Sequence, residues 1–200
     1  MDFSLSPEIE ELRRRTRAFV DEHVLPLEAD PKNFSDHENI PHARLEPVRA
    51  KAKEAGLWAP QSPKEYGGMD LPIVAWAVMY EEAARSLFGP LAMNCMAPDD
   101  GNMNVLKKLG TPRQKDKWLK PIVDGKVRSS FAMTEPAPGG GSDPSMIRTY
   151  AEKHGDIWKI HGRKWFITGA DGAAQLCLAA RTSDDKRKGI TTFQFHKGQP

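Results

Sequence analysis

From residue 147 to residue 168 the chain reads IRTYAEKHGDIWKIHGRKWFIT, three short runs rich in β-branched and aromatic residues. The runs are Ile147–Lys153, Ile157–Ile160 and Lys164–Thr168, and His154-Gly155-Asp156 and His161-Gly162 separate them. Glycine beside aspartate between two such runs is typical of a hairpin turn. Because no helix-length segment lies between the runs, we expect antiparallel pairing rather than a doubly wound parallel sheet.

The same pattern continues on both sides of this segment. Further strands are predicted over Arg128–Met133, Ala174–Arg181 and Thr191–His196, which gives a sheet of at least five strands. The character of the sequence changes near residue 127, before which it has helical periodicity. We therefore predict an α+β fold, with an all-α helical domain over residues 1–126 and an antiparallel β domain over residues 127–200.

Several helices are predicted in the first part. Ser6 is a suitable N-cap with Pro7 at the first helical position, and an apolar stripe at three- and four-residue spacing follows it. We expect Pro26 and Pro31 to end this helix. Further helices are predicted over residues 42–55, 72–85, 102–109 and 112–123. The helix over 72–85 is apolar on almost all sides, which predicts that it is buried.

Composition excludes several classes of protein. The 200 residues carry 29 Lys and Arg against 27 Asp and Glu, a net charge of +2, which argues against binding nucleic acid or a membrane surface through bulk charge. No segment approaches the roughly 20 apolar residues of a membrane span. The two cysteines, Cys95 and Cys177, support neither a disulfide framework nor a zinc site. With no secretory signal pattern at the N-terminus, we expect a cytoplasmic protein.

Two segments are candidates for ligand binding. The glycine-rich segment Thr134–Asp143 lets backbone N–H groups approach a phosphate or a ring carbonyl, although a mobile surface loop is the alternative. The second segment is Lys164–Gly169. On a strand, Trp165 and Phe166 point to opposite faces, so one enters the core and the other is free to face a planar ligand, unless both simply pack. Thr168 is either a ligand donor or a turn residue.

Other chemistry finds little support in the sequence. The six histidines have no metal-binding spacing, and no metal site is predicted. No G-x-S-x-G motif occurs, and neither cysteine has a catalytic signature. The basic run Arg13-Arg14-Arg15 lies on a predicted helix, where a solvated face is a simpler interpretation than a binding patch.

Several ordered motifs together resemble the acyl-CoA dehydrogenase family. Residues 131–136, FAMTEP, followed by Gly141-Ser142-Asp143, resemble the family's aromatic-x-x-T-E-P…G-S-D signature, and residues 157–168 resemble its companion hairpin, x-I-N-G-x-K-x-W-I-T. The upstream segment Glu65-Tyr66-Gly67-Gly68 also matches in order. Residues 94–102 are similar to the subgroup that includes members fused to kinase-like domains.

The resemblance implies an N-terminal helical domain, a middle β domain and a C-terminal helical domain that this chain lacks. It implies FAD as the cofactor. The residues that match the family's flavin-binding positions are Phe131, Met133, Thr134, Ser142, Phe166, Ile167 and Thr168. Ser142 also corresponds to a contact with the acyl-CoA substrate, and Phe166 stands where the family usually has tryptophan. The chain ends directly after a predicted strand, so we expect a longer protein, with the catalytic base beyond residue 200 and none within this chain.

The activity that the resemblance implies is α,β-dehydrogenation of an acyl-CoA thioester to the trans-2-enoyl-CoA. Electrons then pass to an electron-transfer flavoprotein, and the enzyme is expected to be a homo-oligomer. An acyl-CoA oxidase or a flavin monooxygenase on the same fold is an alternative. A non-catalytic binding module, whose motifs only pack, is another.

Overall fold

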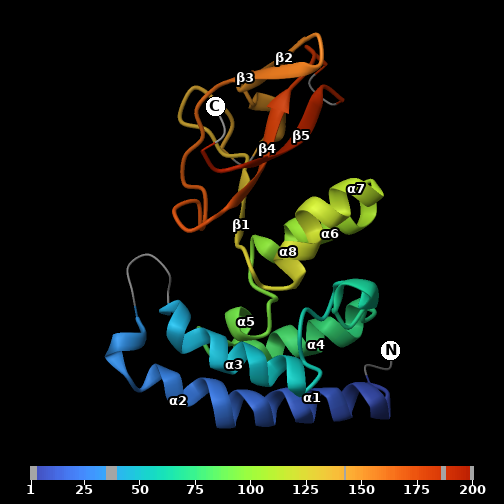
Figure 1. Ribbon diagram of the computed structural model, residues 1–200, viewed down its shortest axis with the longest axis vertical. Coiled ribbons are helices and arrows are strands. Elements are labelled where there is room, and N and C mark those ends of the chain that lie inside the picture. The colour runs from blue at the N-terminus through green and yellow to red at the C-terminus, as the bar shows by residue number, and fades with distance from the viewer. Residues whose placement is uncertain (1–3, 35–39, 142, 186–187, 199–200) are drawn as a thin grey trace. The chain divides into compact units, whose positions relative to one another are not determined.

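The computed structural model describes residues 4–34, 40–141, 143–185 and 188–198 (Figure 1). The chain forms two compact units, Met1–Lys126 and Val127–Pro200. The first unit is helical and the second carries the sheet. The predicted α+β class is therefore confirmed.

The helical unit is built from short and medium helices, some of them joined end to end. Their bounds are α1 (Pro7–Phe19), η1 (Val20–Val24), α2 (Leu25–Glu28), η2 (Pro31–Asn33), α3 (His42–Glu54), η3 (Lys64–Tyr66), α4 (Ile73–Ala83), α5 (Gly89–Ala92), α6 (Asp99–Leu109), α7 (Pro112–Gln114), η4 (Lys115–Leu119) and α8 (Lys120–Val123).

Two prolines closely follow π-helical turns and continue a helical segment instead of ending it. Pro26 was expected to end the first helix, but α1, η1 and α2 run on without a break to Glu28. The segment η1 is a π-helical turn, and the N–H of Leu25 bonds the carbonyl of Val20, five residues earlier. The wider turn lets the next residue be a proline, which has no N–H and would clash with a carbonyl of a regular α-helix. The same arrangement recurs where η4 precedes Pro121.

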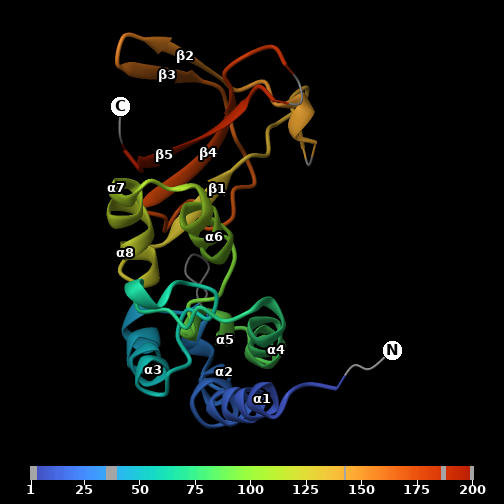
Figure 2. The same ribbon diagram turned by 90° about the vertical axis from the view of Figure 1, so that its right-hand side faces the viewer.

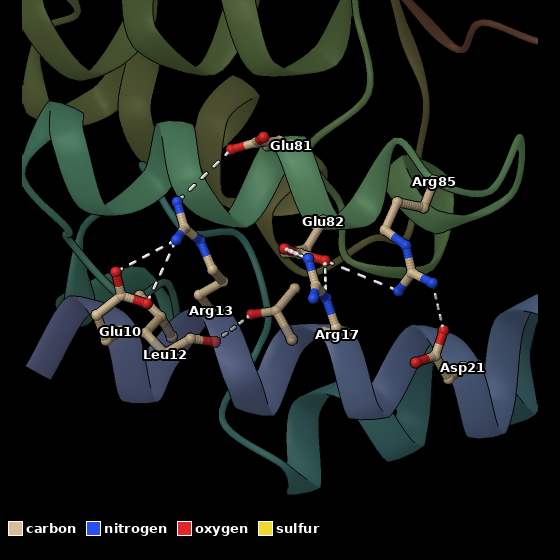
Figure 3. Close-up of polar contacts among 9 residues, drawn as sticks. Glu10, Leu12, Arg13, Arg17, Asp21, Glu81, Glu82 and Arg85 are labelled. Carbon is tan, nitrogen blue, oxygen red and sulfur yellow. Dashed lines mark hydrogen bonds and ion pairs between the residues drawn. The ribbon is translucent and has the colours of Figure 1, made fainter. Parts of the chain in front are cut away.

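Charged side chains join α1 to α4, which lie side by side (Figure 3). The Glu82 carboxylate is only 2% exposed and accepts two hydrogen bonds from Arg17, at 2.9 and 2.8 Å. Arg85 lies 3.7 Å from Glu82 and 2.8 Å from Asp21. These pairs fix the register of the two helices.

The predicted basic run contributes to contacts within the same unit. Arg13 and Arg14 pair with glutamates one turn earlier on α1, at 3.2 and 2.6 Å. Arg15 donates to the carbonyl of Ala55 at 2.5 Å. All three arginines therefore have partners inside the protein, and the solvated-face interpretation holds for Arg14, which pairs on an exposed helix surface.

The helices predicted over residues 42–55, 102–109 and 112–123 are found close to those bounds. Gly56 follows α3 with φ of +65°, a conformation that suits glycine at a helix C-terminus. The expected burial of the helix over 72–85 is only partly correct. Val78 and Met79 of α4 are buried, whereas Ile73 in its first turn is 67% exposed.

The second unit contains a five-stranded sheet, in which Figure 2 shows the β2–β3 and β4–β5 hairpins. The strands are β1 (Ser129–Ala132), β2 (Tyr150–His154), β3 (Ile157–His161), β4 (Gln175–Arg181) and β5 (Ile190–His196), with a short turn of helix, η5 (Pro144–Met146), before β2.

The sheet is mixed, which corrects the prediction of a wholly antiparallel one. The pairs β2–β3 and β4–β5 are antiparallel hairpins, as expected, but β1 and β4 are parallel, and β2 meets β4 in the parallel sense at a single position. A parallel pair needs a long crossover connection. Here the β2–β3 hairpin and its flanking loops form that crossover in place of a helix, so the absence of a helix did not exclude parallel pairing.

Candidate functional site

One edge of β1 is open in the described part of the unit. The Arg128 carbonyl accepts hydrogen bonds from the N–H groups of Ala174 and Gln175, at 3.0 and 3.4 Å. Because backbone groups alternate sides along a strand, those of Ser130 and Ala132 face β4, while those of Phe131 and Met133 face away from it. No described strand pairs with that side of β1. Lys164 already bonds the Met133 carbonyl on this side, while the Phe131 backbone groups and the Met133 N–H have no described partner and are ready to bind another polar edge.

The segment from residue 162 to residue 172 is tied to β1 and to the residues that follow it. The N–H of Trp165 bonds the Thr134 carbonyl at 3.1 Å. The Ser130 hydroxyl donates to the Thr168 carbonyl at 3.0 Å. These bonds place the second predicted ligand-binding segment beside the first, although about thirty residues separate them in the chain.

A buried ion pair fastens the two segments together. The Glu135 carboxylate accepts hydrogen bonds from Lys164 Nζ at 2.8 Å and from the N–H groups of Arg148 and Thr149 at 2.7 and 2.9 Å. Lys164 also donates to the Met133 carbonyl at 2.7 Å. Burial favours the neutral acid, but the hydrogen bonds, Lys164 first among them, outweigh it and lower the pKa of Glu135 to about 2. The glutamate is thus an anion that holds the site in shape.

Two aromatic rings project from this junction. Trp165 and Phe166 are 42% and 82% exposed, and their ring centroids lie 4.6 Å apart at 35°. The prediction that one ring enters the core is wrong, as is the predicted strand over Lys164–Thr168. Phe166 has φ of +50°, which ends any extended run and turns both rings outward. Exposed aromatic surface of this size is typical of a binding site.

The structure brings most of the predicted cofactor residues to this junction. Phe131, Met133 and Thr134 lie on β1 or directly after it, and Phe166, Ile167 and Thr168 lie on the segment bonded to it. Ser142 lies outside the described residues.

Sequence reasoning missed three residues that hold the site together: Ser130, Glu135 and Lys164. Glu135 and Lys164 stand inside the two motifs that we singled out, but no role was assigned to them. The sequence did contain a signal for this pair, because Glu135 and Lys164 each stand beside a predicted strand. Charged residues that are buried are usually paired.

An open polar strand edge beside an exposed aromatic pair suits a planar ring that carries hydrogen-bonding atoms on its rim.

Among the described residues, no cluster of three or more His, Cys, Asp or Glu side chains has the arrangement of a metal site. In the described part of the chain, no helix combines the length and the apolar character needed to cross a membrane.

Comparison with known proteins agrees with this architecture. Residues 6–126 match the family model described as acyl-CoA dehydrogenase, N-terminal domain, and residues 130–200 match the one described as acyl-CoA dehydrogenase, middle domain. The chain therefore belongs to the acyl-CoA dehydrogenase family, which confirms the resemblance drawn from its motifs.

Two relatives illustrate the match. The chain is 39% identical over 194 residues to the Mycobacterium tuberculosis protein named "Probable acyl-CoA dehydrogenase FadE2", covering 92% of this chain and 46% of that protein. It is 34% identical over 188 residues to mouse acyl-CoA dehydrogenase family member 10, covering 90% of this chain and 18% of that protein. The chain thus spans less than half the length of these relatives.

Solved structures share the fold. A Mycobacterium abscessus protein assigned to the acyl-CoA dehydrogenases has a TM-score of 0.87 and 32% identity, with 99% of this chain and 52% of that chain covered. A structure titled "PigA with FAD and proline" has a TM-score of 0.79 and 25% identity, with 100% of this chain and 50% of that chain covered.

Proposed function

We propose that this chain is the flavin- and substrate-binding portion of an FAD-dependent enzyme that desaturates an acyl-CoA thioester. The product is the trans-2-enoyl-CoA, and electrons pass on to an electron-transfer flavoprotein. The observation that carries the proposal is the open edge of β1 beside the exposed Trp165–Phe166 pair. Family membership, and a similar structure titled with FAD, support it.

The residues present fit a flavin. Its pyrimidine edge carries alternating hydrogen-bond donors and acceptors, which match the backbone groups of Phe131 and the N–H of Met133 on the open side of β1, whereas the Met133 carbonyl is bonded to Lys164. Thr134 adds a hydroxyl at the end of the strand, and Phe166 adds an apolar wall. Ile167 and Thr168 continue this wall, and we assign Ser142 to the cofactor's phosphates or the substrate by resemblance alone. When bound, FAD supplies the hydride acceptor of the reaction.

The chain's own residues then hold and shield the reacting groups. Lys164 and Glu135 fix the loop that carries both rings, so the rings keep their place without the ligand. The two rings exclude water from one side of the site. No residue of this chain is assigned as the base that removes the α proton, and we assign that step to the remainder of a longer protein, acting as a homo-oligomer.

The first test is binding of FAD to the purified chain, followed through flavin absorbance and quenching of tryptophan fluorescence. Phe166→Gly removes the exposed ring and relieves the left-handed backbone. We expect this variant to fold at least as stably as the wild type but to bind FAD about tenfold more weakly, by analogy with stacking on an aromatic ring. A matched change on an exposed apolar side chain in the other unit, Leu87→Gly, serves as the control. Unchanged affinity in Phe166→Gly would contradict the proposed flavin site.

A second measurement separates the enzyme classes. Acyl-CoA is added anaerobically to the full-length protein with bound FAD, and bleaching of the flavin is recorded. A dehydrogenase bleaches without oxygen and yields little peroxide in air, whereas an oxidase yields peroxide in proportion to substrate. Failure of acyl-CoA to bleach the flavin would leave the binding module as the better account.

A further inference from the structure

A cleft lies in the unit that carries the sheet, at the base of the β2–β3 hairpin. Its volume is about 270 Å³. One wall is the glycine-rich loop over residues 136–139, and the other comes from the starts and ends of the two strands, with Arg148, Tyr150, His161 and Arg163 among the lining residues. The exposed Trp165–Phe166 pair does not line it.

Two arginines that flank the paired part of the hairpin line this cleft. Tyr150 faces His161 in the β2–β3 ladder, and their rings stack with centroids 5.1 Å apart. One position further, a Cβ on Gly162 would lie 2.2 Å from the Thr149 hydroxyl, so the two strands remain in close contact there. Arg148 and Arg163 lie beyond the paired residues, one before β2 and one after β3, and both line the cleft.

This arrangement leaves positive charge without a partner. Like charges that line the same cleft repel each other. Among the described residues, neither guanidinium group forms an ion pair or a hydrogen bond. The acid in the lining, Glu135, is already bonded to Lys164 and to two backbone N–H groups. The cleft therefore carries two arginines that no described acid neutralises.

We propose that this cleft binds a phosphate group of a nucleotide, with the phosphate between Arg148 and Arg163 and the base against the Tyr150–His161 ring pair. Guanidinium groups bind phosphate in a bidentate manner, and a phosphate between them removes their repulsion. Aromatic rings stack on a base. Ligand sites generally measure about 300–1,000 Å³, so a cleft slightly below this range suits a mononucleotide better than a complete dinucleotide. The inference does not depend on flavin binding at β1.

The test is calorimetric titration of the purified chain, without FAD, at low ionic strength. The probes are 5′-ADP, 3′,5′-ADP, adenosine and inorganic phosphate. We expect saturable binding of at least one of the two ADP isomers, with weaker binding of adenosine and of phosphate, and a fall in affinity as salt is added. Tighter binding of 3′,5′-ADP identifies the nucleotide end of coenzyme A as the source, and tighter binding of 5′-ADP identifies an adenosine 5′-diphosphate group, whether free or within a larger nucleotide.

Charge-removing variants locate the site. Replacing either arginine with glutamine should weaken ADP binding about tenfold. A hydrogen bond to a charged group typically contributes enough binding free energy to change a dissociation constant by that factor. The double variant Arg148→Gln/Arg163→Gln should lose binding while its unfolding temperature without ligand stays the same or rises, because the repulsion is gone. The matched control is Lys153→Gln/Lys159→Gln, which removes the same charge from the same hairpin outside the cleft.

Three results would overturn the proposal. One is the absence of saturable ADP binding at low salt. Another is an equal loss of affinity in the lysine control, which would indicate diffuse attraction to a basic hairpin. The third is phosphate binding as tight as ADP, together with no effect of Tyr150→Ala, which would exclude recognition of a base.

Discussion

Replacing Lys164 with methionine tests the role of the buried pair that joins the two segments of the candidate site. The change keeps most of the apolar stem but leaves the 4% exposed Glu135 without its cation. Removing one partner of a buried ion pair typically costs about 3–5 kcal/mol. Two backbone N–H groups still bond Glu135, so we expect a loss near the lower end, about 3 kcal/mol in the free energy of unfolding.

The measurement is urea-induced unfolding of the wild type and Lys164→Met at neutral pH, with the exposed Lys159→Met as the control. The double variant Glu135→Gln/Lys164→Met should lose less than the sum of the single changes, because no uncompensated charge remains. A loss below about 1 kcal/mol in Lys164→Met would refute the reasoning, since a loss that small is typical of an exposed ion pair.

The pH dependence of the same variant gives an independent result. The folded-state pKa of Glu135 is lowered from 4.5 to about 2, so the pair's contribution is fully present above about pH 4.5 and is lost as the pH falls toward 2. The difference in stability between the wild type and Lys164→Met should therefore narrow over that range. A difference that stays constant between pH 5 and about 2.5 would indicate that packing, not charge, is responsible.

Two further predictions concern the packing of each unit. Arg17→Met should destabilise the helical unit in urea unfolding, because the buried Glu82 carboxylate loses two hydrogen bonds and keeps only Arg85, at 3.7 Å, as a cationic partner among the described residues. Arg14→Gln, which breaks a pair on the exposed face, should have a clearly smaller effect. Equal effects would mean that burial of the carboxylate is unimportant. Gly162→Ala should lower the free energy of unfolding by about 1–3 kcal/mol, because the new Cβ would lie only 2.2 Å from a neighbouring hydroxyl oxygen. Gly172→Ala, which has open space around it, should change the free energy of unfolding by less than about 0.5 kcal/mol. Thermal unfolding of both variants checks this.

Local sequence signals predicted the elements that depend on neighbouring residues. The turn signals at Gly155 and Gly162 correctly bounded β3. The helix start at Pro7 followed from proline at the first helical position. In each case the determining contact lies within a few residues along the chain.

The features that sequence reasoning missed depend on contacts between distant segments. The parallel pairing of β1 with β4 joins residues more than forty positions apart, and no local pattern encodes it. The Lys164–Thr168 run has β-type residues, but its backbone bonds Thr134 and Ser130 instead of a strand. The position of the site was predicted by motif resemblance, whereas the ion pair that supports it became visible only in three dimensions.

The π-helical turn before Pro26 has a consequence for how this sequence can change over evolutionary time. The π-helical turn, with its extra residue, accommodates the proline that follows it. Losing either the extra residue or the proline alone would therefore destabilise the helix. Deleting one residue from Val20–Val24 would rotate the rest of the helix and drive the proline ring into a carbonyl, unless Pro26 were replaced in the same step. The same coupling applies to η4 and Pro121. Insertions and deletions in these two helices are therefore expected to occur together with a gain or loss of proline.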